Sequence, residues 1–299
     1  MISIAFPEID PAAFYIPIPF VGWLPIRWYA LAYIAGLLGA WSFILRMLKT
    51  DRLWAGLPFN GKPQATRDHI GDLFVWAALG VILGGRLGYV LFYGFVYQPE
   101  IYLESPWRVF AAWEGGMSFH GGAIGVVLAI IIFARVNKLD MVALGDLVAA
   151  ATPIGLFFGR MANFVNGELW GKVSDVPWAM QFPAAAIRAP DGTVLSNPAR
   201  HPSQLYEAAL EGVVLFAILY VLIHRFGILK RPGLAIAVFW AGYGTFRIFV
   251  ELFFRENTHQ SLFGGAVAMG TVLSLAMWAF AGFFFWYALY RKGPALQTQ

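Results

Sequence analysis

Long apolar runs recur along almost the whole chain, and they constrain the fold more than any other feature. Of the 299 residues, 59% are hydrophobic and only 13% are charged, whereas soluble domains carry about 25% charged residues. An apolar stretch of about 20 residues is long enough to cross a bilayer as a helix. Because such stretches repeat, a soluble domain with one anchor is excluded, and we predict an all-α, polytopic membrane protein.

Seven spanning helices are expected from the apolar runs. Their approximate bounds are Trp23–Leu48, Ile70–Gly94, Phe119–Ala134, Met141–Val165, Gln204–His224, Gly233–Phe254 and Gly264–Tyr290. They share one membrane core, so residues 1–299 are predicted to form a single integral membrane domain. The longest connection, residues 166–203, is rich in proline and contains an Asp-Gly pair at residues 191–192. Such turn chemistry indicates a folded arm between the fourth and fifth helices.

Lys and Arg in the connections predict the orientation. One side of the membrane would carry the richer set, which comprises Lys49, Arg52, Lys62, Arg67, Arg135, Lys138, Arg225, Lys230, Arg231, Arg291 and Lys292. The other side would carry Arg108, Lys172, Arg188, Arg200 and Arg255. Basic residues beside helix ends favour the cytoplasmic side. The N-terminus and the arm are therefore predicted outside and the C-terminus inside, which fits an odd number of spans.

Composition narrows the classes of function. The chain has no cysteine, so it supplies no thiol nucleophile, thiolate metal site or disulfide. Its formal charge of +4 suits basic loops facing the anionic lipids of a membrane, and no compact basic domain indicates a nucleic acid partner. No metal-ligand cluster is visible and no metal is expected. The opening segment has Glu8 and Asp10 but no Lys or Arg, so we expect a retained, extended or interfacial arm rather than a signal peptide.

Four polar clusters interrupt the apolar sequence. They are GGRLGYVLFYG with Arg86, WEGGMSFHGG with His120, GRMANFVNGELWGK with Arg160, Asn163 and Glu168, and YGTFRIFVELFFRE with Tyr243, Arg247 and Glu251. The predicted orientation puts the last three clusters at the same outer depth and Arg86 somewhat deeper. Charges that face lipid cost at least ~2.5–3.5 kcal/mol each. The charged faces are therefore expected to point inward, toward one another or a wet cavity.

Helical spacing groups these polar residues on shared faces. The spacing is i, i+3 and i+7 for Arg160, Asn163 and Gly167, and i, i+4 and i+8 for Tyr243, Arg247 and Glu251. Arginines and amides that oppose each other near the outer surface form a site for an anion. The abundant anion at that surface is a phospholipid head group.

Some of these polar residues could instead have purely structural roles. Arg247 and Glu251 could form only a structural i,i+4 pair, and Arg86 could hydrogen-bond helix ends without touching a ligand. Glu168 is expected to partner an arginine rather than to act as a base.

For two histidines we likewise consider a structural and a functional role. His201, in HPSQLYEA, is expected to cap or orient the fifth helix rather than to react. His120 is a stronger functional candidate, because it lies beside glycines in a polar loop at the depth of the polar clusters.

The chain resembles the prolipoprotein diacylglyceryl transferases, bacterial inner-membrane enzymes that begin lipoprotein maturation. The matching motifs are GGRLGYVLFY, SFHGG, GRMANFVNGELWGK, RHPSQLYEAALEG and YGTFRIFVE. They occur in order in the second through sixth predicted helices, and GRMANFVNGELWG is the most specific of them. The family has seven spans with the N-terminus outside, which agrees with the topology predicted from the charges.

The resemblance implies roles for individual residues. His120 corresponds to the family histidine proposed to assist the thiol. Arg160 corresponds to a phosphatidylglycerol-binding position and Arg247 to the second essential arginine of the family, and we take all three residues as catalytic candidates. The substrate-binding candidates are Tyr29, Arg86, Asn163, Glu168, Gly171, Tyr243 and Glu251. One departure concerns Arg255: the family reads E-x-F-R-E-P-D or E-F-F-R-x-P-D, whereas this chain reads ELFFRENTH. An inserted residue rotates a helix face by about 100°, so the role of Arg255 is left open.

The implied reaction moves the diacylglyceryl group of phosphatidylglycerol onto the lipobox cysteine of a preprolipoprotein, forming a thioether and releasing glycerol 1-phosphate. A free thiol has a pKa of about 8.5, so a base such as His120 would assist its ionisation. Arg160 and Arg247 would stabilise the charge that builds on the phosphate, and no cofactor is needed. The alternatives are a lipid or anion transporter that uses the same arginines and a phospholipid-dependent transferase with another acceptor.

Overall fold

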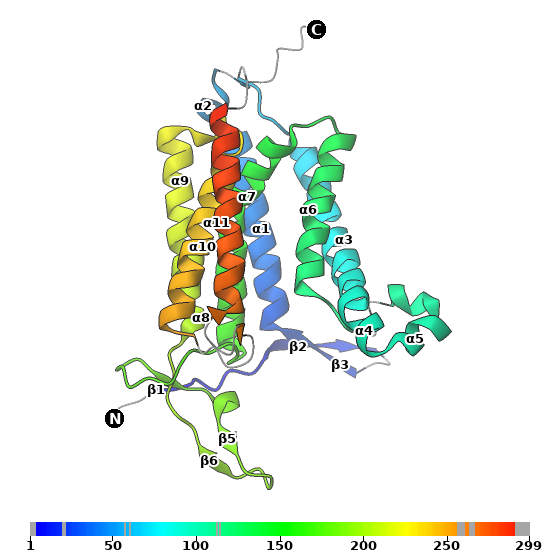
Figure 1. Ribbon diagram of the computed structural model, residues 1–299, viewed down its shortest axis with the longest axis vertical. Coiled ribbons are helices and arrows are strands. Elements are labelled where there is room, and N and C mark those ends of the chain that lie inside the picture. The colour runs from blue at the N-terminus through cyan, green and yellow to red at the C-terminus, as the bar shows by residue number, and fades with distance from the viewer. Residues whose placement is uncertain are drawn as a thin grey trace. The chain divides into compact units, whose positions relative to one another are not determined.

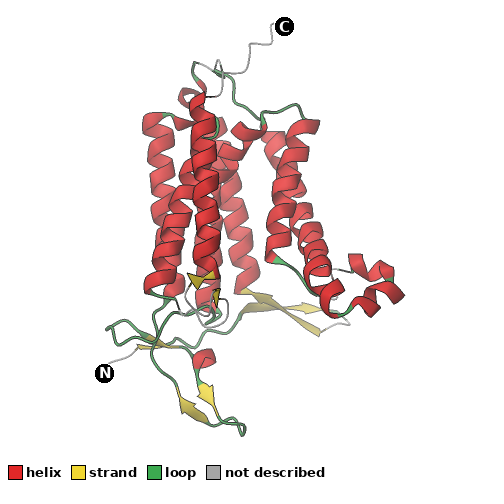
Figure 2. Cartoon of the chain, in the orientation of Figure 1, coloured by secondary structure: helices red, strands yellow, loops and turns green. Residues whose placement is uncertain are grey.

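The computed structural model describes residues 4–19, 22–56, 58–59, 61–111, 113, 115–255, 261–262 and 267–290. Helices make up most of the described chain, and its strands are short and occur in pairs (Figure 2). The chain forms two compact units, which we call the large unit (Met1–Phe43 and Asp146–Gln299) and the small unit (Ile44–Gly145). The boundaries fall inside two long helices, α1 (Trp28–Leu48) and α7 (Met141–Val165). The single membrane domain stays a prediction.

The small unit is built on two long helices that pack together (Figure 1). The first is α3 (Arg67–Tyr89), which continues through the π-helix η1 (Val90–Gly94) into α4 (Phe95–Tyr97), and the second is α6 (Phe119–Val136). The short elements of this unit are α2 (Asp51–Trp54), α5 (Pro99–Glu104) and the 3-10 helix η2 (Pro106–Phe110).

Glycines bring α3 and α6 close together. A Cβ atom built on Gly80 would lie 2.6 Å from the carbonyl oxygen of Gly125, and one built on Gly88 would lie 2.6 Å from the Cα atom of Gly121. Small residues at four-residue intervals let two membrane helices approach until their backbones touch. Because this packing holds the residues just before and within the first turn of α6, it positions the loop that leads into that helix.

The large unit carries the remaining long helices. They are α1, α7, the continuous run of α8 (Ser203–Glu207), η5 (Ala208–Val214) and α9 (Leu215–Phe226), then α10 (Leu234–Phe253) and α11 (Met269–Tyr290). The 3-10 helix η6 (Ile228–Lys230) joins α9 to α10. Asp146 of α7 is buried and accepts hydrogen bonds from the backbone N–H groups of Gly233 (2.7 Å) and Ile236 (2.9 Å). This carboxylate satisfies N–H groups that the first turn of α10 leaves open.

Short strands make up the extended parts of the large unit. An antiparallel hairpin joins β2 (Ala12–Ile18) to β3 (Gly22–Arg27), with Ala12 opposite Arg27 and Ile18 opposite Gly22. The other strands are β1 (Ile4–Ala5), β4 (Met180–Gln181), β5 (Ile187–Arg188), β6 (Val194–Ser196), β7 (Ser261–Leu262) and β8 (Val267–Ala268). The segment between α7 and α8 contains β4, the 3-10 helix η4 (Pro183–Ala185) and the β5–β6 hairpin. The segment therefore has short strands and turns of its own, and its place outside the membrane stays a prediction.

The predicted spans agree in position with helices of the structure, with two changes at their starts. The first helix begins at Trp28 rather than Trp23, because residues 22–27 pair with β2 and Pro25 has no N–H to donate within a helix. The last begins at Met269 rather than Gly264, because residues 267–268 form β8.

Length and composition qualify five helical runs of the described chain to cross a membrane: Trp28–Leu48, Arg67–Tyr97, Met141–Val165, Ser203–Phe226 and Leu234–Phe253. Two further apolar stretches, His120–Val136 and Ser274–Tyr290, are shorter. The protein is therefore a polytopic membrane protein, and the exact count of seven crossings stays a prediction.

Candidate functional site

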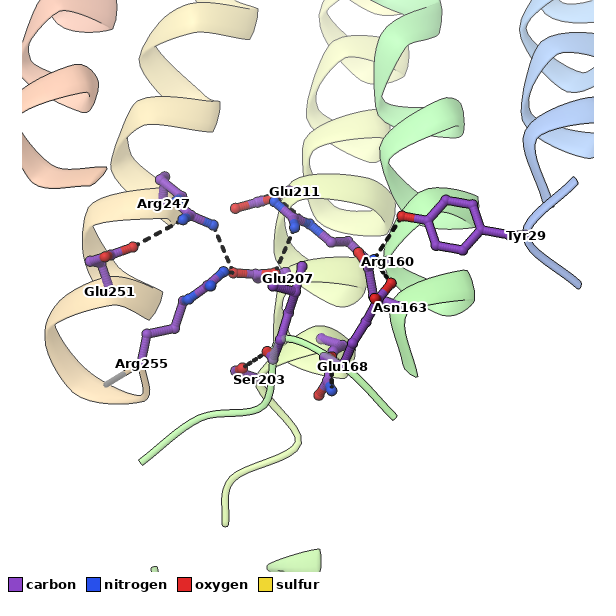
Figure 3. Close-up of polar contacts among 12 residues, drawn as sticks. Tyr29, Arg160, Asn163, Glu168, Ser203, Glu207, Glu211, Arg247, Glu251 and Arg255 are labelled. Atoms are coloured by element: carbon purple, nitrogen blue, oxygen red, sulfur yellow. Dashed lines mark hydrogen bonds and ion pairs between the residues drawn. The ribbon is translucent and has the colours of Figure 1, made fainter. Parts of the chain in front are cut away.

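Glu207 joins three arginines of the large unit. Its Oε2 atom pairs with Nη1 of Arg160 at 3.1 Å, and its Oε1 atom accepts from Nη1 of Arg247 at 2.8 Å and from Nη1 of Arg255 at 2.9 Å (Figure 3). The Glu207 side chain is fully buried. We define the arginine–glutamate cluster as Arg160, Glu207, Glu211, Arg247, Glu251 and Arg255. One carboxylate thus links α7, α10 and the turn after α10.

Glu211 is the second carboxylate that binds Arg160. Its Oε2 atom lies 3.2 Å from Nε and 3.1 Å from Nη2 of that arginine. Glu207 ends α8 and Glu211 lies in the π-helix η5, so they are four residues apart along one continuous helical run. Residues at this spacing stand on one helix face, and both carboxylates therefore reach Arg160. π-helical turns inside α-helices are frequent at functional sites.

Arg247 has one partner on its own helix and one on another. Its Nη2 atom pairs with Oε2 of Glu251, four residues further along α10, at 3.1 Å. The predicted i,i+4 pair is therefore present. Arg247 also reaches Glu207, however, so the pair with Glu251 is only part of its environment.

Arg255 belongs to the same cluster although it lies outside the helix. α10 ends at Phe253, and the N–H of Arg255 donates to the carbonyl oxygen of Val250 at 3.1 Å. A turn, rather than the period of the helix, therefore sets the direction of this side chain. The extra residue before Arg255 does not move its guanidinium away from the other arginines.

Burial explains why these charges occur in pairs. The side chains of Glu207 and Glu211 are fully buried, and those of the three arginines keep 16–18% of their exposure. A buried ion is stable only when it is paired and hydrogen-bonded, and removing one partner of such a pair costs roughly 3–5 kcal/mol. The inward-pointing charges that the sequence predicts therefore form one connected network.

Asn163 organises a second group of polar side chains, one helical turn beyond Arg160. Its Nδ2 atom donates to the hydroxyl of Tyr29 at 2.9 Å and to Oε1 of Glu168 at 2.8 Å. The predicted arginine partner of Glu168 is thus replaced by an amide among the described residues. Asn163 is buried, so its two hydrogen bonds fix the positions of the tyrosine and of the carboxylate.

The turn that carries Glu168 is strained and is held by the start of α8. Leu169 has a φ of 58°, which is uncommon for a residue other than glycine. The Oγ atom of Ser203 donates to the carbonyl oxygen of Leu169 at 2.9 Å, and Nε2 of Gln204 donates to that of Glu168 at 2.5 Å. Both donors are fully buried. Such strain persists only where the surroundings impose it, and it occurs often at functional sites.

Gly171 lies where the arm passes the end of α10. Its N–H donates to the carbonyl oxygen of His201 at 2.9 Å, and the next N–H, of Lys172, donates to the carbonyl oxygen of Phe254 at 2.7 Å. A Cβ on Gly171 would lie 2.9 Å from Cβ of His201. Close backbone approach therefore accounts for this glycine, and its contact with substrate stays a prediction.

His201 lies against α8, as the orienting reading predicts. Its Nδ1 atom is 3.1 Å from the hydroxyl of Tyr206, and Pro202, rather than His201, is the N-cap residue of α8. Burial, and then the nearby charge of Lys172, lower the pKa of His201 below its usual value. The neutral ring suits a hydrogen bond with the tyrosine.

Tyr243 lies on the cluster side of α10. Its ring stacks on that of Phe239 with centroids 5.8 Å apart. Its hydroxyl lies within electrostatic range of Arg160, Glu211 and Arg247. The face predicted from i, i+4 and i+8 spacing is therefore the face that meets the cluster.

Arg86, in the small unit, binds backbone carbonyl groups. Its Nε atom donates to Val109 at 3.2 Å, Nη2 to Arg108 at 2.6 Å and Nη1 to Gly115 at 2.5 Å. Arg86 is only 4% exposed. The structural role predicted for this residue, hydrogen bonding to helix ends, thus accounts for its contacts with the carbonyl groups of Arg108 and Val109 in η2. Substrate binding by Arg86 stays a prediction.

His120, also in the small unit, lies in the first turn of α6 and is exposed. The turn is capped by Ser118, whose Oγ atom accepts from the N–H of Gly121 at 3.2 Å. The exposed position leaves the imidazole accessible to another molecule.

Sequence reasoning missed four residues of the site. They are Ser203, Gln204, Glu207 and Glu211, all within the motif RHPSQLYEAALEG. A signal was present, because two carboxylates four residues apart in an otherwise apolar spanning helix must face inward.

Comparisons with known proteins show the family of this chain. Residues 16–287 match the model of the family described as Prolipoprotein diacylglyceryl transferase. Proteins named phosphatidylglycerol–prolipoprotein diacylglyceryl transferase are similar to the chain. That of Allorhizobium ampelinum is 50% identical over 95% of this chain and 91% of its own length. That of Cereibacter sphaeroides is 48% identical over 93% and 95%. That of Rhizobium meliloti is 49% identical over 92% of each. With a match that spans most of its length, this chain belongs to the prolipoprotein diacylglyceryl transferase family.

Proposed function

We propose that this protein transfers the diacylglyceryl group of phosphatidylglycerol to the cysteine thiol in the lipobox of a preprolipoprotein. The sulfur forms a thioether with the glyceryl carbon, the bond from that carbon to the phosphate oxygen breaks, and glycerol 1-phosphate leaves. Family membership and the names of the relatives support a transferase over a lipid or anion transporter.

The observation that carries the proposal is the convergence of Arg160 and Arg247 on one anion. From two different helices they hold the two oxygens of Glu207, at 3.1 Å and 2.8 Å. Arginine presents a planar fork of donors that suits carboxylate and phosphate alike. The arginines are thus already placed to bind two oxygens of a single anionic group.

The arginines would act mainly in the transition state. The phosphodiester of phosphatidylglycerol carries one negative charge, and the leaving phosphate develops toward two. Donors fixed beside it bind the transition state more tightly than the ground state, which is the requirement for catalysis. Because Glu207, Glu211 and Glu251 hold the guanidinium groups in place, little reorganisation is needed when the charge develops.

His120 is the proposed proton acceptor for the substrate thiol. Histidine accepts protons near neutral pH, whereas a free thiol has a pKa of about 8.5 and is mostly protonated there. The exposed place of His120 in the first turn of α6 supports access by a peptide. The proton leaves sulfur for the imidazole as the carbon–sulfur bond forms.

The proposed transferase function also suggests which residues contact the substrates and where the protein is located. Tyr29, Asn163 and Glu168 form one hydrogen-bonded group that we assign to the lipid head group, with Tyr243 and Glu251 beside the arginines. The acceptor is the lipobox segment of a preprolipoprotein. We place the protein in the bacterial inner membrane with its N-terminus in the periplasm and its C-terminus in the cytoplasm, in contact with membrane lipids.

The test uses protein purified in detergent, phosphatidylglycerol and a synthetic lipobox peptide. The peptide should gain the mass of one diacylglyceryl group, with release of one glycerol phosphate per peptide. A peptide with serine in place of the cysteine is the matched control and should stay unchanged. Movement of phosphatidylglycerol across the membrane of vesicles that contain the protein, without a mass gain on the peptide, would support the transporter instead. A mass gain on another acceptor would identify a different transferase.

A further inference from the structure

The arginine–glutamate cluster is electrically balanced before any substrate enters. Arg160, Arg247 and Arg255 are paired within the chain with Glu207, Glu211 and Glu251. Three positive charges therefore meet three carboxylates. A head group that enters this partly buried region adds a negative charge to a neutral cluster, and an uncompensated charge is costly where water is scarce.

Glu211 has one buried carboxylate oxygen that makes neither a hydrogen bond nor an ion pair with the described residues. Its Oε2 atom takes both contacts with Arg160, while its Oε1 atom is buried and has no hydrogen-bond partner among the described residues. The side chain is fully buried. In the free protein the two contacts with Arg160 compensate the charge of Glu211. An added anion competes for Arg160, and a protonated carboxyl group is then favoured, because it is neutral and can itself donate.

In the other two glutamates, Oε2 also has no hydrogen-bond partner among the described residues, but it lies in an ion pair with an arginine. Glu207 binds three arginines through its two oxygens, and Glu251 pairs with Arg247 and keeps 10% of its side-chain exposure. The charged groups that face Glu211 are Arg160 from α7, Arg247 from α10 and Glu207 from its own helical run, with the hydroxyl of Tyr243 also in range. Glu207 raises the cost of a second negative charge beside it, which again favours neutralisation of Glu211.

Resting on the function proposed above, we propose that Glu211 takes up a proton when the anionic head group binds. The proton comes from solvent, one negative charge is cancelled, and the three arginines then balance two glutamates and one phosphodiester. Arg160 then no longer pairs with a charged Glu211, so its guanidinium group binds the head group more strongly. Binding of one lipid is thus linked to binding of one proton.

The direct test measures protons taken up on binding. Dihexanoyl phosphatidylglycerol is a suitable probe, because its phosphodiester keeps a single negative charge throughout the experiment. Calorimetric titration of the full-length protein in two buffers of different ionisation enthalpy gives the number of protons bound. We expect about one proton per lipid, and a Kd that rises about tenfold per pH unit on the alkaline side.

Two variants locate the proton. Glu211→Gln is neutral at every pH, so it should bind the probe without proton uptake and with a Kd that no longer changes with pH. Asp191→Asn, in the exposed turn between β5 and β6, is the matched control. It should keep the wild-type proton uptake and the wild-type pH dependence of the Kd. If Glu207→Gln removes the uptake while Glu211→Gln retains it, the assignment to Glu211 is wrong.

The wild-type measurement decides the matter even if a variant fails to fold. Saturable binding of the probe without proton uptake would overturn the inference and leave the proposed function intact. The contrary result, no binding of phosphatidylglycerol and no transfer to a lipobox peptide, would instead remove the proposed function itself.

Discussion

The choice of arginine rather than lysine is decided by the number of contacts that each side chain makes. Arg160 uses all three of its nitrogens to bind Glu207 and Glu211, and Arg247 uses both terminal nitrogens to bind Glu207 and Glu251. Lysine keeps the charge but offers a single nitrogen. It can hold one carboxylate or one phosphate oxygen, but not two groups at fixed angles.

Arg160→Lys and Arg247→Lys should each lower transfer by roughly 10²-fold or more, since fixed donors at developing charge contribute about that much. The loss should appear in kcat at saturating phosphatidylglycerol, because the contact is strongest in the transition state. Turnover and melting temperature should be measured on the same purified variants. A fully active Arg247→Lys enzyme would reduce Arg247 to the structural partner of Glu251.

His120→Gln tests the proton acceptor. Glutamine keeps a hydrogen-bonding side chain but cannot take a proton, so transfer should fall by roughly 10²–10⁴-fold. Raising the pH should restore part of the rate, because the substrate thiol then ionises without help. The pH profile of kcat/KM for wild type and variant is the measurement, and identical profiles would place the base elsewhere.

At the scale of elements, the close contact between α3 and α6 depends on glycines, which have no side chain to separate the two backbones. Gly84 of α3 faces the backbone of Gly121, and a Cβ built on it would lie 2.7 Å from the Cα atom of Gly125. Backbone atoms cannot rotate away as a side chain does, so the two helices would have to separate. The same packing supports the start of α6, where His120 lies.

Gly84→Ala should therefore destabilise the small unit, by roughly 1–3 kcal/mol as for other overpacked sites. Gly71→Ala on the same helix is the matched control, because a Cβ there meets nothing within 4 Å. The control should be neutral or slightly stabilising, since alanine favours helix over glycine. Melting temperatures in one detergent compare the two, and equal values would contradict the close contact.

At the scale of the whole molecule, the distribution of basic residues predicts how the chain is oriented in the membrane. The connections next to Lys49, Arg135, Arg225 and Arg291 are richer in Lys and Arg than those on the opposite side. Positive residues near helix ends stay in the cytoplasm. The arm at 166–203 is therefore predicted to be periplasmic.

A reporter fused after Gln299 should be cytoplasmic, and a label attached at Asp191 should react with a reagent that does not cross the membrane. Asp191 suits the label because it is exposed in the turn of the β5–β6 hairpin. A label at Lys138 in a loop of the opposite set is the control and should be protected in intact cells. An external C-terminus would invert the predicted topology.

Hydropathy and helical spacing were enough to predict the membrane class, the approximate positions of the helices and the inward faces of Arg160 and Arg247. These properties are local, because hydropathy and helical period depend on neighbours along the chain. Lipid excludes unpaired charge, so an inward face for each arginine follows from composition alone.

The partners of those faces, in contrast, depend on how the helices pack in three dimensions. The bridging role of Glu207, the hydrogen bond from Asn163 to Tyr29 and the return of Arg255 to the cluster all join residues that are far apart in sequence. Pattern and period contain no information on which helix lies beside which. The β2–β3 hairpin likewise moved the start of α1 to Trp28, because strand pairing satisfies the backbone of residues that, by hydropathy alone, would continue the helix.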